Sequence, residues 1–247
     1  MVYDAKVDKW ESTYWHPAVA VDAVVFGYDE EDKCLSVLLI TRGEEPFMGS
    51  WALPGGFITQ DDESAEAAVY RELHEETNVE GIYLEELKTF SKIGRDPRDD
   101  ERVISIAFFA LVVKNSYVIK GGSDARKAKW FPVDHLPTLA FDHQEIINVA
   151  LERLRRSIHF EPIGFHLLNK EFTMPQLQNI YIAILMPPEG DNGLRDRRNF
   201  MKKMQKLGYI RETGNKVTGT PWRSPKLYTF DEDAYRKVKK LGMRLEF

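Results

Sequence analysis

The chain has 247 residues, of which 43% are hydrophobic and 30% are charged, and its net charge is −5. This length suits two domains, and this composition argues against general disorder. Because the N-terminus has no apolar signal-peptide core, because no later apolar run approaches the length of a membrane span, and because the single Cys34 cannot form an intramolecular disulfide, we expect a cytoplasmic protein with no membrane partner.

The first 158 residues alternate strand-like and helical segments. The predicted strands are 18–28 and 35–41, which are rich in Val, Ile and Leu, then 82–90, 103–113 and a short last strand at 129–133. From residue 142, apolar residues recur with the spacing of an amphipathic helix. We interpret this helix as the end of a first domain, 1–158, and as its bridge to a second domain, 159–247.

A second helix, predicted over 63–79, carries an unusual group of acidic residues. Ser64 suits the N-cap of this helix and Asn78 its left-handed C-terminal residue. Glu72, Glu75 and Glu76 are spaced as i, i+3 and i+4, so like charges face one side of the helix and repel one another. A surface network of ion pairs would offset this repulsion, and so would a divalent cation shared by the carboxylates.

The second domain predicts a winged helix-turn-helix. A helix capped by Thr173, with Pro175 in its first turn, is followed by the turn MPPEGDNG and by a basic helix that starts at Leu194 and is closed by Gly208. Two short strand candidates then flank a loop that carries Gly and Lys. Helix, turn, basic helix and hairpin follow one another in the order of this DNA-binding motif.

Charge supports a role for this domain in binding DNA. Residues 191–226 hold ten Lys or Arg residues against three acidic ones, so the rest of the chain is strongly acidic. The basic helix has an apolar stripe of Phe200, Met204 and Leu207, which leaves its cations on the remaining surface. The candidate contacts to double-stranded DNA are Arg195, Arg197, Arg198, Asn199, Lys202, Lys203, Lys216 and Arg223. The alternative is a solvated basic face without a partner.

The segment GGFITQDDESAEAAVYRELHEETNV resembles the signature of the Nudix hydrolase family, G-x5-E-x7-R-E-U-x-E-E-x-G-U, in which U is a bulky aliphatic residue. The step from Gly56 to Glu63 is one residue longer than in the family, and Asn78 replaces a glycine. An insertion can bulge within a loop, and Asn tolerates positive φ better than most residues, so neither departure removes a carboxylate. The matching positions are Gly56, Glu63, Arg71, Glu72, Leu73, Glu75, Glu76 and Val79.

This resemblance implies a diphosphate-cleaving site that uses Mg²⁺ or Mn²⁺, because carboxylate-held divalent cations stabilise phosphoryl charge and activate water. Arg71 would orient the carboxylates, and Gly55 and Gly56 would let the backbone approach phosphate. The implied catalytic residues are Arg71, Glu72, Glu75, Glu76 and Glu63, of which Glu72, Glu75 and Glu76 would hold the metal.

The substrate is indicated less directly. Nudix enzymes that act on ADP-ribose carry a proline beyond the signature at about the distance of Pro97, which lies slightly later in this chain. Arg42, Arg95 and Arg98 could bind phosphate or ribose oxygens with two parallel hydrogen bonds. The alternative for these arginines is that they only keep the loops soluble.

Over nearly its full length, the chain resembles the Nudix-related transcriptional regulators of the NrtR type, which control NAD metabolism. The stretches WALPGGF, RDPR, LAFDHQEI and RDRRNF carry this resemblance. It implies an α+β fold, with a Nudix α/β/α sandwich around a mixed sheet followed by a winged helix-turn-helix domain. It also implies a homodimer that binds operator DNA and responds to ADP-ribose or a related nucleotide or sugar. The alternatives are a plain hydrolase whose second domain only mediates interaction or dimerisation, and a sugar-responsive regulator with an inactive Nudix domain.

Overall fold

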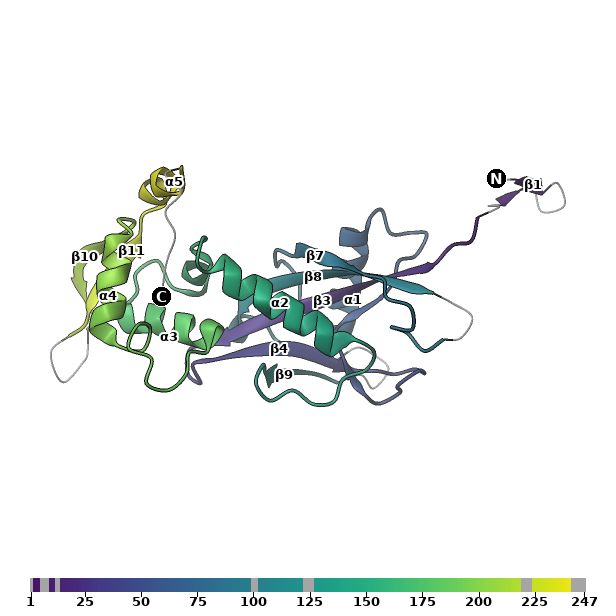
Figure 1. Ribbon diagram of the computed structural model, residues 1–247, viewed down its shortest axis with the longest axis horizontal. Coiled ribbons are helices and arrows are strands. Elements are labelled where there is room, and N and C mark those ends of the chain that lie inside the picture. Colours follow the sequence, from purple (N-terminus) through teal and green to yellow (C-terminus); the bar gives the residue numbers. More distant parts are fainter. Residues whose placement is uncertain are drawn as a thin grey trace.

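The protein has a sheet-based part and a smaller helical part, which lie end to end along the long axis of the molecule (Figure 1). The computed structural model describes residues 2–4, 9–11, 14–98, 102–121, 127–218 and 224–240, the first two segments as backbone only. The helices are α1 (Ala65–Thr77), α2 (His143–Ser157), α3 (Met174–Leu185), α4 (Arg197–Lys206) and α5 (Glu232–Lys240), with 3-10 turns η1 (Lys114–Ser116) and η2 (Ile163–Leu167).

A seven-stranded sheet forms the first part. Its strands are β3 (Ala18–Asp29), β4 (Cys34–Thr41), β5 (Trp51–Ala52), β6 (Gly55–Phe57), β7 (Glu85–Phe90), β8 (Val103–Val113) and β9 (Ala128–Pro132). The order is β5-β4-β3-β8-β7, while β6 pairs with β3 and β9 with β4. The pairing of β3 with β8 is parallel and the other pairings are antiparallel, which confirms the predicted mixed sheet.

Strand β3 contributes to two hydrophobic cores because successive side chains point to opposite faces of a sheet. Val21 and Val25 pack in a cluster with Val69 of α1, whereas Val24 and Phe26 belong to the cluster that contains residues of α2. One helix therefore covers each face, as expected for an α/β/α sandwich. A strand buried on both faces reads as a continuous apolar run, which explains the composition of 18–28.

The ends of α1 confirm the predicted caps. The Ser64 hydroxyl accepts a hydrogen bond from the backbone N–H of Ala67 at 3.2 Å, and Asn78 has φ 60°. Val69 and Leu73 face the core, so the neighbouring Glu72 lies at its edge. The strand predicted over 82–90 is shorter than expected, since β7 begins at residue 85.

The second part has the predicted winged-helix order. Thr173 and Gln176 form a capping box at the start of α3, and β10 (Ile210–Lys216) pairs antiparallel with β11 (Lys226–Phe230). The basic helix is shorter than predicted, because Asp196 caps it and α4 starts at residue 197. Helix α5 follows the hairpin and was not predicted.

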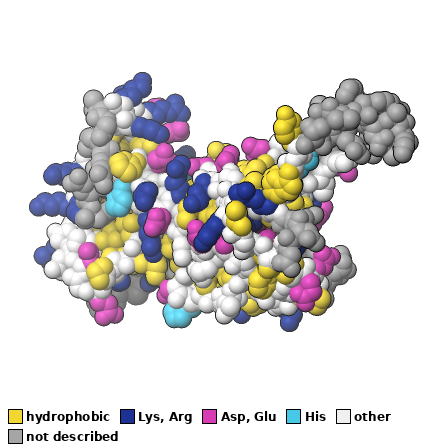
Figure 2. Space-filling model, turned by 45° about the vertical axis from the view of Figure 1, so that its right-hand side comes forward, with side chains coloured by type: hydrophobic (Ala, Val, Ile, Leu, Met, Phe, Trp, Pro, Cys, Tyr) yellow, Lys and Arg dark blue, Asp and Glu magenta, His cyan; other side chains and the backbone are white. Residues whose placement is uncertain are grey.

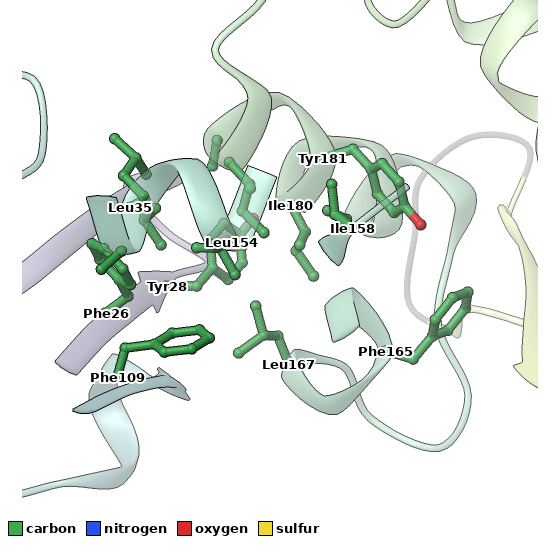
Figure 3. Packing of buried hydrophobic residues seen from close by; sticks show 14 of the residues in the cluster. Phe26, Tyr28, Leu35, Phe109, Leu154, Ile158, Phe165, Leu167, Ile180 and Tyr181 are labelled. Carbon is green, nitrogen blue, oxygen red and sulfur yellow. The ribbon is translucent and has the colours of Figure 1, made fainter. Parts of the chain in front are cut away.

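The two parts share one hydrophobic core. Figure 3 shows Leu154 and Ile158, from the C-terminal end of α2, beside Ile180 and Tyr181 of α3, with Phe26 of β3 in the same cluster. The expected boundary near residue 158 therefore falls within continuous packing and stays a prediction.

A short hairpin of β1 (Val2–Asp4) and β2 (Lys9–Glu11) projects from the sheet-based part (Figure 1). In the part of the chain that the structure describes, no helix combines the length and the apolar character needed to cross a bilayer.

Candidate ligand pocket and DNA-binding surface

A pocket of about 210 Å³ lies where β3, β6, α1, the loop after β7 and the start of α2 meet. Its wall contains every residue predicted from the sequence to bind substrate, and two of the three predicted metal ligands. These residues are Arg42, Gly55, Gly56, Arg95, Arg98, Glu72 and Glu76. The sheet and helix α1 thus bring together residues that are up to 56 positions apart, from Arg42 to Arg98.

The two glycines are required by close approach. A Cβ on Gly56 would lie 2.3 Å from Oε1 of Glu72, and a Cβ on Gly55 would lie 2.1 Å from the carbonyl oxygen of Val21. The backbone N–H of Gly55 donates to Oε2 of Glu76 at 2.9 Å. The two carboxylates of α1 therefore lie directly against the glycine backbone.

Arg71 is held by three carboxylates. Its Nε and Nη2 donate to both oxygens of Asp62 at 2.9 and 2.8 Å, and its Nη1 donates to Glu72 at 2.7 Å and lies 3.5 Å from Glu75. The hydrogen bonds from Arg71 hold the pKa of the Asp62 carboxyl well below its usual range, and those to Asp62 and Glu72 raise the pKa of Arg71. Asp62 was not predicted; it lies in the longer loop, where it also accepts from the backbone N–H of Thr59.

The predicted cluster of three metal ligands is not formed. The Glu75 side chain is 58% exposed and turns toward Arg71, and Glu63 is exposed as well. Neither residue lines the pocket. Within the described ranges, no three His, Cys, Asp or Glu residues are arranged to hold a metal ion.

The remaining groups still suit a divalent cation. Mg²⁺ is commonly held by one or two carboxylates together with substrate phosphates, which Glu72 and Glu76 could supply from the protein side. The pocket wall has five carboxylates (Asp22, Glu44, Glu72, Glu76 and Asp96) against three guanidinium groups (Arg42, Arg95 and Arg98). An anionic diphosphate would therefore need additional positive charge to bind there.

Asp22, Arg95 and His143 of the pocket wall belong to a polar network that was not predicted from the sequence. Arg95 donates to both carboxylate oxygens of Asp142 at 2.9 and 2.7 Å and lies 3.6 Å from Asp22. Ser105 donates to Asp22 at 2.5 Å, and Nε2 of His143 lies 3.4 Å from the other Asp22 oxygen. A lone Asp22 within an apolar strand was the one signal in the sequence that could have indicated this network.

His143 is neutral in this network. Its Nδ1 accepts a hydrogen bond from the backbone N–H of Leu53 at 2.8 Å, so the proton of the ring is on Nε2, which faces Asp22. Burial lowers the pKa of His143, against the opposing effect of the Asp22 charge. The imidazole therefore links the start of α2 to the sheet without adding a charge.

Aromatic rings border the pocket. The guanidinium carbon of Arg42 lies 4.6 Å from the ring centroid of Phe141, and that of Arg98 lies 5.0 Å from Phe57. Nε of Arg42 also donates to the carbonyl oxygen of Pro46 at 2.8 Å, so this arginine supports its own loop. Phe141 has φ 51°, a conformation that non-glycine residues rarely adopt.

Helix α4 presents a basic outer face. Phe200 and Met204 are buried, while Arg197, Arg198 and Lys202 are exposed. Figure 2 shows Lys and Arg side chains projecting at the left end of the molecule, where the winged-helix part lies.

The other DNA candidates are distributed around this face. Arg195 donates to the carbonyl oxygens of Pro187 and Pro188, and the Asn199 amide donates to that of Asn192, so both side chains brace the loop before α4. Lys203 lies on α4 and is partly buried, and Lys216 is exposed at the end of β10. Arg223 lies outside the described residues.

Comparison with known proteins agrees with this architecture. The Nudix domain family matches residues 16–150, and the NrtR DNA-binding winged helix domain family matches residues 164–230. The chain is 31% identical over 224 residues to the ADPR responsive transcriptional repressor NtrR of Acinetobacter baylyi, which covers 89% of this chain and 84% of that protein.

Two further relatives match one or both parts. The chain is 44% identical over 135 residues to the ADP-ribose pyrophosphatase of Methanocaldococcus jannaschii, covering 55% of this chain and 73% of the enzyme. The crystal structure of Shewanella oneidensis NrtR complexed with a 27mer DNA superimposes with a TM-score of 0.64 at 33% identity, covering 88% of this chain and 95% of that one. The chain belongs to the Nudix family, as a Nudix-fused transcriptional regulator with an NrtR-type winged helix domain.

Proposed function

We propose that this protein is a transcriptional repressor that binds operator DNA through its winged helix and releases it when ADP-ribose occupies the Nudix pocket. One observation carries the proposal: a pocket with glycines, arginines and paired glutamates shares a continuous core with a helix whose outer face is basic. The names of the Acinetobacter, Methanocaldococcus and Shewanella relatives supply the ligand class and the DNA.

ADP-ribose suits the groups in the pocket. Arg95 and Arg98 can donate to diphosphate oxygens, and the Gly55–Gly56 backbone leaves room for a phosphate beside the carboxylates. Phe57 and Phe141 offer ring surfaces for the base or the sugar.

We also propose that the site hydrolyses the diphosphate of ADP-ribose. A divalent cation, Mg²⁺ or Mn²⁺, would neutralise phosphoryl charge and lower the pKa of a bound water when present. Glu72 and Glu76 would hold it, and Arg71 keeps Glu72 in position through the 2.7 Å bond. Glu75 and Glu63, which lie outside the pocket wall, would act only if a bound substrate drew them inward.

On the DNA side, Arg197 and Arg198 at the start of α4 would contact base edges. Lys202 and Lys216 would contact phosphates. A homodimer would place two copies of α4 on successive major grooves of a palindromic operator. The exposure of these four side chains supports these roles.

The test begins with an operator selected by the protein itself from a random duplex library. Fluorescence anisotropy then measures DNA affinity at fixed salt, with Mg²⁺ present, with and without ADP-ribose. To prevent turnover, the ligand is an analogue whose bridging oxygen is replaced by methylene. We expect the analogue to weaken DNA binding, whereas AMP with ribose 5-phosphate has little effect. Equal binding curves in all conditions would overturn the sensor function and favour a plain hydrolase.

Two added arms separate the alternatives. Free pentoses that release DNA where the ADP-ribose analogue does not would indicate a sugar-responsive regulator. Hydrolysis of ADP-ribose without selection of any duplex would leave an enzyme whose winged helix serves only for interaction.

A further inference from the structure

Arg95 lies between the ligand pocket and the carboxylate of Asp142. It lines the ligand pocket, yet its Nε and Nη2 already donate to the Asp142 carboxylate at 2.9 and 2.7 Å. The Arg95 side chain is 5% exposed, so it has little freedom to serve a pocket ligand and Asp142 at once with the same two nitrogens. A phosphate that accepts the hydrogens now donated to Asp142 must displace this carboxylate.

Asp142 also has a place in the secondary structure, because it is the N-cap residue of α2. A capping Asp usually accepts hydrogen bonds from the first helical N–H groups, but the Asp142 side chain makes no such bond here. Its carboxylate is used by Arg95 instead. The start of α2 is therefore fastened to the ligand pocket through this ion pair.

The other end of α2 is fastened to the winged helix. Leu154 and Ile158 belong to the cluster that contains Tyr181 of α3 (Figure 3), and Nε of Arg155 donates to the carbonyl oxygen of Ile184 at 3.0 Å. Tyr181 in turn packs edge-on against Phe200 of α4, with ring centroids 5.6 Å apart. Helix α2 has 15 residues, a rigid span of about 22 Å, between the pocket and this packing.

We propose that the Arg95–Asp142 ion pair is the contact through which the pocket ligand controls the winged helix. This proposal rests on the proposed function. A ligand phosphate takes Arg95, the released Asp142 carboxylate is repelled by the phosphate, and the start of α2 moves away from the pocket. Because α2 packs on α3, and α3 on α4, the recognition helices lose the spacing that the operator requires.

This arrangement would make the ligand bind more tightly to the conformation in which Asp142 has left Arg95. A ligand changes DNA affinity only if it binds the two conformations differently. With Asp142 present, the DNA-binding conformation withholds from the ligand the two Arg95 hydrogens that Asp142 accepts. Without the carboxylate, the ligand can use Arg95 in either conformation, so it should bind more tightly and lose its influence on DNA.

The variants Asp142→Asn and Asp142→Ser test this reasoning. Both remove the charge that competes for Arg95, and Ser retains the ability to cap α2, which protects the fold. The matched control is Glu85→Gln, which removes a 2.7 Å ion pair from Arg153 of α2 to β7 on the exposed side of the helix.

Calorimetry with the methylene analogue and Mg²⁺ measures ligand affinity, and anisotropy measures release of the selected duplex. For both Asp142 variants we expect ligand affinity to rise about tenfold, equivalent to about 1.4 kcal/mol, and the factor by which ligand weakens DNA binding to fall toward one. Glu85→Gln should match the wild type in both.

The outcomes separate this proposal from the function on which it rests. If the wild-type protein releases DNA and both Asp142 variants release it by the same factor, the ion pair is not the controlling contact, although the sensor function stands. Unchanged or weaker ligand binding in both variants would likewise contradict the proposed competition between Asp142 and the ligand for Arg95. If the wild type itself fails to respond, it is the proposed function that is overturned.

Discussion

Replacement of Gly56 by Ala should disable the pocket without unfolding the protein. The new Cβ would lie 2.3 Å from Oε1 and 2.5 Å from Cδ of Glu72, whereas ordinary contacts begin at 3.4 Å. The carboxylate must retreat by roughly 1 Å, and a displacement of this size at a reacting centre can lower the rate by about 10²-fold. Since Arg71 holds the same oxygen at 2.7 Å, the retreat also breaks that hydrogen bond.

The assay compares hydrolysis of ADP-ribose with Mn²⁺ affinity, which is measured by paramagnetic resonance in the presence of the methylene analogue. We expect both to fall in Gly56→Ala, while the melting temperature changes little because the end of a flexible side chain can move. Gly55→Ala is the contrast: its Cβ would meet the backbone oxygen of Val21 at 2.1 Å, so the β3–β6 pairing and the fold should suffer.

A double-mutant cycle tests whether the effect passes through Glu72. If Gly56→Ala acts by displacing that carboxylate, it should add little to the loss already caused by Glu72→Gln. Full rate and full Mn²⁺ affinity in Gly56→Ala would refute the reasoning. Independent, additive losses in the cycle would show that the methyl group acts elsewhere.

Four further predictions follow from the site and the DNA-binding face. Glu76→Gln should remove most metal-dependent hydrolysis, and undiminished turnover would exclude Glu76 as a ligand. Burial keeps the pKa of His143 below its usual 6.5, so the unfolded state binds more protons than the folded state as pH falls below about 6.5, and the free energy of unfolding decreases. The urea midpoint should therefore fall less with pH in His143→Gln than in the wild type, and an equal fall in both proteins would contradict this prediction. Arg197→Ala combined with Arg198→Ala should abolish selective DNA binding and leave hydrolysis intact, whereas retained selectivity would favour a solvated face. Lys216→Ala should weaken binding to all duplexes and reduce the salt slope by about 1, so that an unchanged slope would exclude a phosphate contact.

Local signals in the sequence predicted the elements that depend on neighbouring residues. Ser64 and Asn78 bound α1, and Thr173 caps α3, because each cap acts within a few residues of the chain. Helix α5, which was not predicted, has similar local features, since Asp231 accepts from the N–H of Ala234 and lysines fill the last turn.

The site residues that lie on one helix could be predicted from the sequence. The contacts between segments that are far apart in the sequence could not. The spacing of Glu72 and Glu76 places both on one side of α1, but no spacing rule predicts that Glu75 turns outward to Arg71 or that Asp62 completes the clamp. The Arg95–Asp142 pair joins residues 47 positions apart. It depends on how α2 packs against the sheet, which local periodicity does not specify.

We propose that the Nudix pocket and the DNA-binding helix are energetically coupled, and thermodynamic linkage tests this coupling most directly. The methylene analogue is titrated calorimetrically, with Mg²⁺ present, into the protein alone and into the protein saturated with its selected duplex. If the two sites are coupled, DNA must weaken ligand binding by the same factor by which ligand weakens DNA binding. Equal ligand affinities with and without DNA would contradict the account.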